Sequence, residues 1–243
     1  MLPETGDAAL TTTDLTNVVV AIPTLNEQDS IEAVVCDLQR VGVNRIVVAD
    51  GGSTDATAER ALRAGAEVID AGRGYGRACI AAADMAADND VIVFMDGDGA
   101  DDPGSIGAMV APIQSGSHDF VIGSRVRGER EPGSMAWHQV GAGLLAGLGM
   151  RALYGVRYTD MGAFRAIRRS TLLQLGMREM TYGWNIEMQM RAARAGLRIL
   201  EIPVPYRRRT GGVSKVAGSL RGTVRAGSRI LATFVRVYMQ PAS

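Results

Sequence analysis

Two carboxylates follow a purely apolar stretch of the sequence. Residues 91–95 read VIVFM, which is typical of a buried strand, and Asp96-Gly97-Asp98 comes directly after them. Such a strand would carry both side chains to the edge of a sheet. Two hard oxygen ligands placed there suit Mg²⁺ or Mn²⁺, and an ion with so few protein ligands shares its other positions with substrate phosphates. We therefore expect Asp96 and Asp98 to bind a divalent metal, the alternative being a solvated turn.

Positive charge suited to a phosphate occurs in the second half of the chain. Residues 209–215 read RTGGVSK and place Arg209 and Lys215 around a flexible pair of glycines. Lys215 is the only lysine among 26 Lys and Arg residues, and a compact ammonium in such a loop suits phosphate contact. The alternative is a solvated basic loop. Arg125, which follows an apolar run at residues 120–123, is a further candidate cation.

The net charge of the 243-residue chain is zero, but the charges are divided between its halves. Residues 1–120 contain 6 basic and 20 acidic side chains, and residues 121–243 contain 20 basic and 6 acidic ones. Nucleic-acid binding is not expected, because the basic half lacks interleaved aromatic residues. At 47% hydrophobic and 21% charged residues, the chain is also too apolar to be disordered.

Strands and helices alternate along the sequence. Apolar, β-branched runs predict strands at residues 18–22, 45–49, 67–69, 91–95, 120–123 and 198–204. Helical spacing predicts helices between the first strands, and again near residues 184–195 and 216–238. This alternation favours a parallel, doubly wound sheet, which binds ligands beyond the carboxyl ends of its strands. The pattern is less regular after residue 123, where mixed pairing is expected.

The sequence has no sign of an export signal or a membrane span. Residues 1–17 are polar, acidic and rich in Thr, unlike a secretory signal. The longest nearly continuous apolar run, residues 140–150, is shorter than the ~20 residues that cross a bilayer. We expect a cytoplasmic protein.

Several motifs occur in an order found in one enzyme family. They are residues 23–27 (PTLNE), 50–55 (DGGSTD), 96–98 (DGD), 160–165 (DMGAFR) and 209–215 (RTGGVSK). Together they resemble nucleotide-sugar glycosyltransferases of family 2, and the nearest likeness is to dolichyl- and polyprenyl-phosphate mannose or glucose synthases. The resemblance implies an α/β fold of GT-A type, a Rossmann-like, doubly wound mixed sheet in a single domain over residues 18–215. Residues 1–17 would then be a polar N-terminal segment and residues 216–243 a basic amphipathic helix.

The resemblance also implies roles for individual residues. Asp96 and Asp98 correspond to the anchor for metal and diphosphate, and Arg125 to a phosphate-facing arginine. Residues expected to bind the nucleotide sugar are Pro23, Thr24, Glu27, Asp50, Gly74 and Asp96, with Arg209, Ser214 and Lys215 as a lid over the diphosphate. Two positions depart from the family pattern: Gly51 stands where a second aspartate is common, and Ala100 where some relatives supply a polar metal ligand. Asp101 or water would replace that ligand.

The reaction implied is an inverting, single displacement at the anomeric carbon of a GDP- or UDP-hexose, with mannose or glucose as the sugar. A lipid phosphate acceptor already has an anionic oxygen, whereas a sugar hydroxyl needs a carboxylate to take its proton. Asp160 and Glu187 are the candidate bases and join Asp98 and Arg125 as the expected catalytic residues. Glu187 has an alternative, an i,i+4 ion pair with Arg191.

The C-terminal part of the sequence offers a contact with a membrane. Arg221, Arg225 and Arg229 are spaced four apart in a predicted helix that also has an apolar side, so the helix would lie on an anionic membrane face. The alternative is a helix that packs its apolar side on the domain. The Gly-rich apolar run at residues 140–150 would line a groove for an isoprenoid tail, or belong to the core. These features predict a lipid phosphate acceptor and peripheral contact at the inner face of the membrane.

Other functions remain open at this point. The runner-up is the same donor chemistry with a soluble hydroxyl acceptor. A non-catalytic module that binds nucleotide sugars is a third possibility. A sugar-nucleotide nucleotidyltransferase is disfavoured, because its first strand is normally followed by a glycine- and arginine-rich loop, and residues 23–27 offer neither. A Rossmann dehydrogenase is disfavoured because the glycine-rich residues 72–76 do not follow the first strand. The oligomeric state is not predicted.

Overall fold

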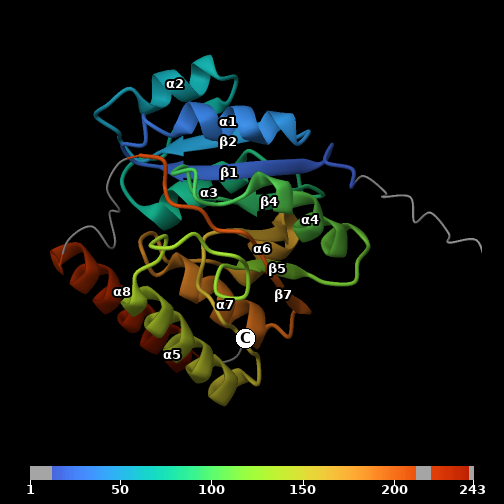
Figure 1. The fold of residues 1–243 in the computed structure, drawn as a ribbon. Coiled ribbons are helices and arrows are strands. Elements are labelled where there is room, and N and C mark those ends of the chain that lie inside the picture. The colour runs from blue at the N-terminus through green and yellow to red at the C-terminus, as the bar shows by residue number, and fades with distance from the viewer. Residues whose placement is uncertain (1–12, 212–219, 241–243) are drawn as a thin grey trace, which may run out of the picture.

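A computed structural model of the protein describes residues 13–211 and 220–240. Within them, seven strands form one sheet in the order β3-β2-β1-β4-β6-β5-β7 (Figure 1). The strands are β1 (Val18–Thr24), β2 (Arg45–Asp50), β3 (Glu67–Asp70), β4 (Val91–Phe94), β5 (Phe120–Ser124), β6 (Arg165–Arg168) and β7 (Ile199–Pro203). The helices are α1 (Ile31–Arg40), α2 (Thr57–Arg63), α3 (Tyr75–Asp84), η1 (Pro103–Ser105), α4 (Ile106–Gln114), α5 (Trp137–Tyr154), α6 (Arg169–Leu175), α7 (Trp184–Arg194) and α8 (Leu220–Met239).

The first four strands pair in parallel, as the sequence predicts. β1 is flanked by β2 and β4, with Thr24 opposite Asp50 and Ala21 opposite Phe94. The carboxyl ends of β1, β2 and β4 therefore meet at one edge of the sheet, which brings residues 23–27, 50–53 and 96–98 together. β-branched residues dominate these strands and fit a pleated, buried surface.

The second half of the sheet is mixed, which confirms the expected change in pairing. β6 runs antiparallel to both neighbours, with Phe94 opposite Arg165 on β4 and Phe120 opposite Ile167 on β5. β5 and β7 are parallel.

The 18-residue helix α5 was not predicted, because its glycines disguise the helical pattern. Glycine costs up to about 1 kcal/mol of helix propensity. The structure explains two of these glycines by close packing. A Cβ on Gly147 would lie 2.0 Å from the carbonyl oxygen of Tyr158, and one on Gly149 would lie 3.4 Å from the ring of Phe234 on α8.

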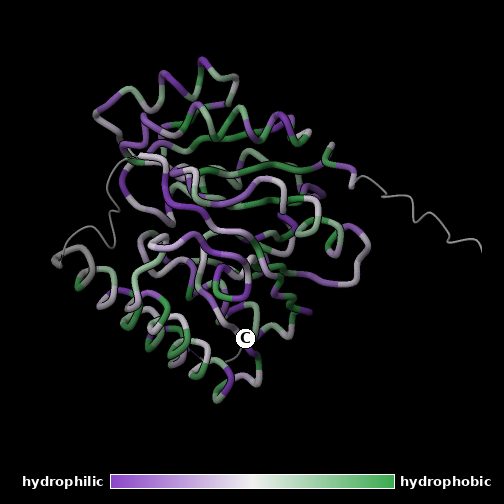
Figure 2. Tube along the Cα trace, viewed as in Figure 1, coloured by the Kyte–Doolittle hydropathy of each residue, from purple (hydrophilic) through white to green (hydrophobic). Residues whose placement is uncertain are grey.

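Helices cover both faces of the sheet, and the strand residues alternate between two cores. Val18, Val20 and Ile22 face α1 and α4, whereas Val19 and Ala21 face α3 and α7. The strands inside these layers are largely hydrophobic along the trace (Figure 2). This three-layer arrangement fixes the strand ends on which the polar residues lie.

The helices α5 and α8 lie next to each other outside α7 (Figure 1). Together they expose a group of large apolar side chains, which we call the apolar face: Trp137, Leu144, Leu145, Leu148, Val224, Leu231, Val235, Tyr238 and Met239. α8 is described from Leu220, so the predicted start near residue 216 lies outside the described residues. Among the residues described, none of the helices is both long and apolar enough to cross a membrane.

Candidate active site

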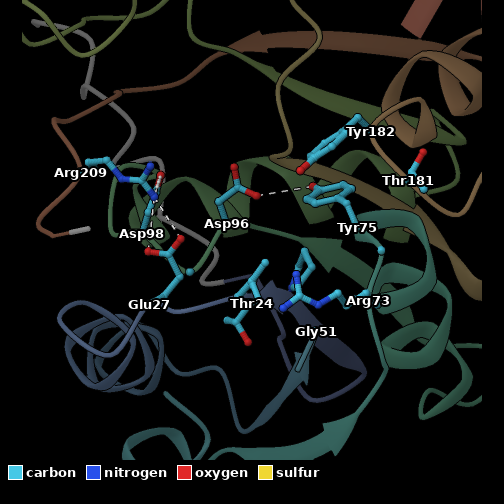
Figure 3. A pocket seen from close by; sticks show the side chains of 15 residues that line it. Thr24, Glu27, Gly51, Arg73, Tyr75, Asp96, Asp98, Thr181, Tyr182 and Arg209 are labelled. Atoms are coloured by element: carbon cyan, nitrogen blue, oxygen red, sulfur yellow. Dashed lines mark hydrogen bonds and ion pairs between the residues drawn. The ribbon is translucent and has the colours of Figure 1, made fainter. Parts of the chain in front are cut away.

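A cavity of about 380 Å³ opens beyond the carboxyl ends of β1, β2 and β4 (Figure 3). We call it the first cavity. It brings together most of the residues predicted to bind a nucleotide sugar, together with the predicted metal ligand Asp98: Pro23, Thr24, Glu27, Gly74, Asp96, Asp98 and Arg209. Its other side-chain walls include Arg73, Tyr75, Thr181 and Tyr182. Ser214 and Lys215 lie outside the described residues, so their predicted place in a lid stays a prediction.

The loop after β1 is held in shape by the loop after β2. Asn26 has a positive φ of 53°, a conformation that asparagine tolerates better than most residues. Its backbone N–H donates to the hydroxyl of Ser53 at 2.9 Å, and its side-chain oxygen accepts from the N–H of Thr54 at 2.8 Å. The N–H of Glu27 donates to Thr57 at 2.8 Å. These bonds present Glu27 to the first cavity.

Asp50 immediately precedes Gly51, which lines this cavity, but does not line it itself. Its carboxylate accepts hydrogen bonds from the N–H groups of Gly52 and Ser53, at 3.2 and 2.9 Å, and one from the Ser53 hydroxyl. The structure thus gives Asp50 a role in holding the turn. Its predicted contact with base or ribose stays a prediction.

The carboxylates after β4 are crowded. Asp101 is buried and accepts a hydrogen bond from the backbone N–H of Asp96 at 3.2 Å. Burial, and next the charge of Asp98, raise the pKa of Asp96, while burial and the charge of Asp96 raise the pKa of Asp101. Negative charge gathered in this way is stabilised by a cation.

The donor set fits a divalent ion that also binds substrate oxygens. Within residues 13–211 and 220–240, no group of three or more His, Cys, Asp or Glu side chains is arranged to hold a metal alone. Asp96 and Asp98 offer only oxygen ligands, and Mg²⁺ sites of few carboxylates are completed by phosphates and water. Asp96 and Asp98 could thus contribute oxygen ligands to a metal site shared with substrate, which stays a prediction.

Arg209 already bridges two acidic side chains at the mouth of the first cavity. Its Nη2 lies 3.1 Å from Oε1 of Glu27 and 3.3 Å from Oδ2 of Asp98 (Figure 3). The backbone N–H of Thr210 donates to the carbonyl of Asp98 at 3.0 Å, and that of Arg207 to the carbonyl of Ala100 at 2.9 Å. The segment after β7 thus crosses over the loop that carries the carboxylates, and brings a cation from the basic half to it.

A second cavity, of about 300 Å³, lies beside the first. The two share Tyr75, Asp96, Asp98 and Tyr182 as lining residues. The second cavity is otherwise lined by the loops after β5 and β7, by the segment before β6, by the start of α7, and by α5 and α8. The carboxylate pair therefore stands where two binding spaces meet.

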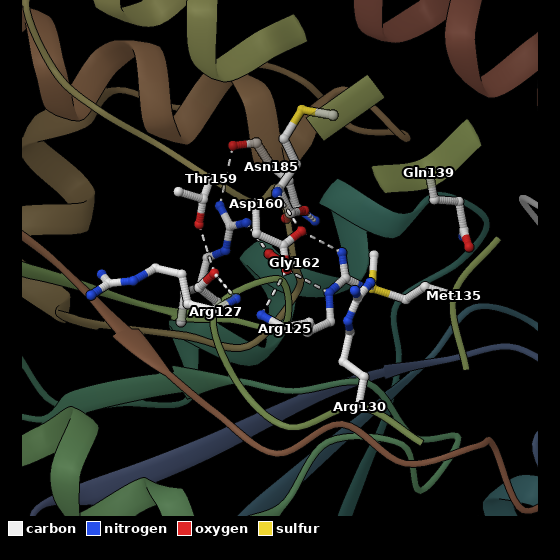
Figure 4. Close-up of polar contacts among 12 residues, drawn as sticks. Arg125, Arg127, Arg130, Met135, Gln139, Thr159, Asp160, Gly162 and Asn185 are labelled. Carbon is white, nitrogen blue, oxygen red and sulfur yellow. Dashed lines mark hydrogen bonds and ion pairs between the residues drawn. The ribbon is translucent and has the colours of Figure 1, made fainter. Parts of the chain in front are cut away.

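An arginine fixed in one orientation lines the second cavity (Figure 4). Nε and Nη2 of Arg125 donate to the two carboxylate oxygens of Asp160 at 2.8 and 2.7 Å, and its guanidinium lies 5.0 Å from the ring centre of Tyr206. Burial lowers the pKa of Arg125, but the bonds to Asp160 outweigh it and raise the pKa above its usual value. Arg125 is thus a permanent cation.

The predicted role of Asp160 as a base does not fit this geometry. Both carboxylate oxygens accept hydrogen bonds from Arg125, and Oδ1 also accepts one from the N–H of Met161 at 2.7 Å. Burial raises the pKa of Asp160, but these bonds overcome it and hold the pKa below its usual value. A carboxylate so stabilised in its charged form is a poor proton acceptor, and Asp160 instead orients Arg125.

Glu187 lines neither cavity. It is fully buried, accepts hydrogen bonds from the N–H groups of Arg178 and Glu179 at 2.9 and 2.6 Å, and pairs with Nε of Arg191 at 3.0 Å. These contacts match the i,i+4 ion pair rather than a base that reaches a substrate.

Sequence reasoning missed the aromatic residues of the site. Tyr75 and Tyr182 line both cavities, and Tyr206 covers Arg125. The sequence signal for two of them was their position: Tyr75 lies in the glycine-rich segment after β3, and Tyr206 lies three residues after the end of β7. The glycines of that segment have a packing role, because a Cβ on Gly74 or Gly76 would lie 2.4 Å from the carbonyl oxygen of Met180 or 2.1 Å from that of Glu179.

Comparisons with known proteins agree with this geometry. The family model described as Glycosyl transferase family 2 matches residues 19–176. An uncharacterized glycosyltransferase of Mycobacterium tuberculosis is 37% identical over 212 residues, which cover 86% of this chain and 94% of the relative. The undecaprenyl-phosphate mannosyltransferase of Micrococcus luteus is 31% identical over 223 residues, which cover 84% of this chain and 89% of the relative.

A solved structure shares the fold. Glucosyl-3-phosphoglycerate synthase from Mycobacterium tuberculosis, in complex with Mn²⁺, UDP-glucose and phosphoglyceric acid, superposes with a TM-score of 0.73 at 22% identity. The superposition covers 93% of this chain and 81% of the other, and it confirms the predicted GT-A type architecture. Because the family match spans more than half of the sequence and the relatives match over nearly their whole length, the chain belongs to glycosyl transferase family 2 and is a glycosyltransferase.

Proposed function

We propose that the protein transfers a hexose, with inversion, from a GDP- or UDP-sugar to a polyprenyl phosphate at the inner face of the membrane. The observation that carries this proposal is the second cavity. It joins a fixed cation, Arg125, to the carboxylates of the first cavity, and its remaining carboxylate, Asp160, is already bound to that cation. Such a space suits an acceptor that carries its own negative charge.

The first cavity is the proposed site of the nucleotide sugar. Asp96 and Asp98 would hold Mg²⁺ or Mn²⁺ together with the diphosphate, as their crowding and the raised pKa of Asp96 favour. The bound ion would stabilise the negative charge that develops on the leaving diphosphate. Arg209 adds a positive charge at the same place, 3.3 Å from Asp98, and needs no reorganisation during the reaction. Glu27 positions this arginine.

Arg125 is the proposed anchor for the acceptor phosphate. A guanidinium held by Asp160 presents its free N–H groups in a fixed direction, and arginine binds phosphate in two-point contacts. The phosphate oxygen attacks the anomeric carbon while the nucleoside diphosphate leaves. Because that oxygen is already anionic, no side chain has to remove a proton.

The walls of the second cavity favour a lipid acceptor. Small and apolar residues of α5 and α8 line one side of it: Ala142, Gly143, Ala226, Gly227 and Ile230. The same two helices carry the apolar face, on which Leu145 is 72% exposed and Leu148 62%. An isoprenoid chain leaving the cavity between these helices would reach a membrane on which that face lies.

A small phosphorylated acceptor is the second candidate. It is favoured by the solved structure named above, which holds phosphoglyceric acid. The same arginine would bind its phosphate or carboxylate, but the apolar lining of the second cavity would then have no partner.

The test measures release of nucleoside diphosphate from GDP- and UDP-hexoses with Mg²⁺ or Mn²⁺. Four conditions are compared: a short polyprenyl phosphate, the polyprenol without phosphate, phosphoglycerate, and no acceptor. We expect release that requires both the metal and the polyprenyl phosphate. Activity with polyprenol would overturn the phosphate acceptor, and a response to phosphoglycerate alone would favour the second candidate.

A further inference from the structure

A short segment between α6 and α7 contacts both cavities and the C-terminal helix. It covers residues 178–182, and its Thr181 and Tyr182 line the first cavity, while Tyr182 also lines the second. Its central acidic residue, Glu179, is 1% exposed and lines neither cavity. The predicted catalytic set does not include Glu179.

Helix α8 is bound to this segment by hydrogen bonds and ion pairs to the Glu179 carboxylate. Nε of Arg229 lies 3.1 Å from Oε1, and the Thr233 hydroxyl and Nη2 of Arg236 each lie 3.0 Å from Oε2. Burial raises the pKa of Glu179, but hydrogen bonds from Thr181, Arg229 and Thr233 outweigh it and hold the pKa below its usual value. Glu179 is therefore charged when α8 is seated.

The same segment is fastened on its other side to α3. The carbonyl of Met180 accepts a hydrogen bond from the N–H of Arg77 at 3.1 Å, in the first turn of that helix. A Cβ on Gly74 would lie 2.4 Å from this carbonyl oxygen, so the two backbones are in contact. The first turn of α3 carries Tyr75, which lines both cavities.

We propose that Glu179 is a positioning residue that couples the seating of α8 to the shape of the first cavity. The hydrogen bonds form a continuous path. Residues of α8 bond to Glu179, Glu179 bonds to Thr181 beside Tyr182, and the carbonyl of Met180 bonds to the first turn of α3. Because α8 also forms a wall of the second cavity and part of the apolar face, an acceptor or membrane that moves this helix changes nucleotide binding. The inference rests on the proposed function only in taking the first cavity as the nucleotide site.

The chain offers two variants that break the link from opposite ends, and a matched control. Glu179→Gln keeps the shape but replaces one acceptor oxygen by a donor that opposes Arg236. Thr233→Val replaces only one hydroxyl of α8 by a methyl group. The control is Asp90→Asn, since Asp90 is also a buried carboxylate paired with an arginine, Arg45, but precedes β4 at the opposite edge of the sheet.

Backbone hydrogen exchange tests the coupling without a ligand. In both Glu179→Gln and Thr233→Val we expect faster exchange in residues 177–183 and at the amide of Arg77, which is bonded to Met180. Asp90→Asn should leave both regions unchanged. Native-like exchange at Arg77 in both variants would overturn the inference, because a change in α8 would then stop at Glu179.

Titration calorimetry of UDP and GDP with Mn²⁺ gives the functional readout. The Kd of the nucleotide that binds the native protein should rise about fivefold or more in Glu179→Gln, and in the same direction in Thr233→Val. Asp90→Asn should bind like the native protein. If the native protein binds neither nucleotide, the proposed function fails while hydrogen exchange still decides the coupling. If Glu179→Gln binds as tightly as the native protein, the coupling fails and the proposed function stands.

Discussion

The acidic residues of the two halves of the molecule have opposite surroundings. In the first half, 20 acidic side chains accompany 6 basic ones, and Asp96, Asp98 and Asp101 crowd together at the sheet edge. In the second half only 6 acidic side chains accompany 20 basic ones, and Asp160, Glu179 and Glu187 are each buried among arginines and backbone N–H groups. Within the described residues, the first group has one arginine at ion-pair distance, Arg209 beside Asp98, whereas every member of the second group is paired with at least one arginine.

This difference separates binding from positioning. Carboxylates that repel one another gain from a bound cation, so the first group is suited to a metal and its phosphate ligands. Carboxylates that already accept several charge-assisted hydrogen bonds hold their partners in place. In the second half, Asp160 fixes Arg125, Glu187 pairs with Arg191, and Glu179 fastens α8.

The largest effect on activity should come from a substitution in the first group of carboxylates. We expect Asp98→Ala to lower metal-dependent kcat about 1,000-fold, because it removes one of two proposed metal ligands and the charge stabilisation they support. Nucleoside diphosphate release measured across a Mn²⁺ titration would show it. Asp119→Asn is the control, since Asp119 forms an exposed pair with Arg198 and precedes β5. Activity of Asp98→Ala near the native level would refute the metal assignment.

The arginine-paired carboxylates of the second half predict a loss of activity that is confined to the acceptor. Arg125→Lys keeps the charge but loses the two-point contact with Asp160, so kcat/KM for the acceptor should fall about 10- to 100-fold. The Kd for nucleoside diphosphate should stay unchanged, because Arg125 lines only the second cavity. Asp160→Asn should give a similar loss, and the double variant little more. A loss of nucleotide affinity equal to the loss of acceptor activity would place Arg125 in the nucleotide site.

The same contrast explains how much the sequence predicts. The parallel half follows from local signals: apolar β-branched runs give the strands, and the parallel register then brings Asp96 and Asp98 to the edge beside residues 23–27. Short motifs could thus predict which residues meet at this cavity, while their roles toward metal and nucleotide stay predictions. The alanine at position 100 offers no side-chain ligand to a metal. Asp101, which the sequence suggests as its replacement, is buried and accepts a hydrogen bond from the N–H of Asp96.

Long-range contacts are what the sequence does not predict. Asp160 is 35 residues from Arg125, and Glu179 is 50 to 57 residues from its partners on α8. A carboxylate in a motif gives no sign of whether arginines saturate it, so Asp160 was predicted to be a base although it positions a cation. The helix α5 was missed for a related reason, because the close packing of Gly147 against Tyr158 and of Gly149 against Phe234 is not visible in the sequence.

The apolar face predicts an effect confined to lipid acceptors. Leu145→Glu with Leu148→Glu should lower transfer to a long-chain polyprenyl phosphate in anionic vesicles about tenfold, since two exposed leucines would no longer enter the bilayer surface. Transfer to a short, water-soluble polyprenyl phosphate should not change. Leu62→Glu is a matched control, because Leu62 is 58% exposed on α2. Equal rates with vesicles for both would show that the apolar face does not bind lipid.

Brominated lipids provide an independent readout of the same contact. Trp137, at the start of α5, is 86% exposed, and Trp184 is fully buried. In Trp184→Phe, the fluorescence of Trp137 should be quenched by vesicles of brominated lipid, whereas in Trp137→Phe the fluorescence of Trp184 should not. Quenching of Trp184 alone would contradict this orientation on the membrane.

The smallest effect on kcat should follow from Glu187→Gln. Glutamine keeps an oxygen that can accept from the N–H of Glu179, so the segment before α7 stays in place. Arg191 loses its charged partner, and Arg236, 3.6 Å from Glu187, keeps its ion pair with Glu179. Removing one partner of a buried ion pair costs about 3 kcal/mol of the free energy of unfolding. Urea denaturation should show this loss, while kcat below the unfolding temperature stays native. Glu32→Gln, which breaks an exposed pair with Arg63, should cost less than about 1 kcal/mol. A large fall in kcat for Glu187→Gln without loss of stability would support the predicted role of Glu187 as a base. It would also show that a carboxylate paired with arginine in this half can still reach the substrate.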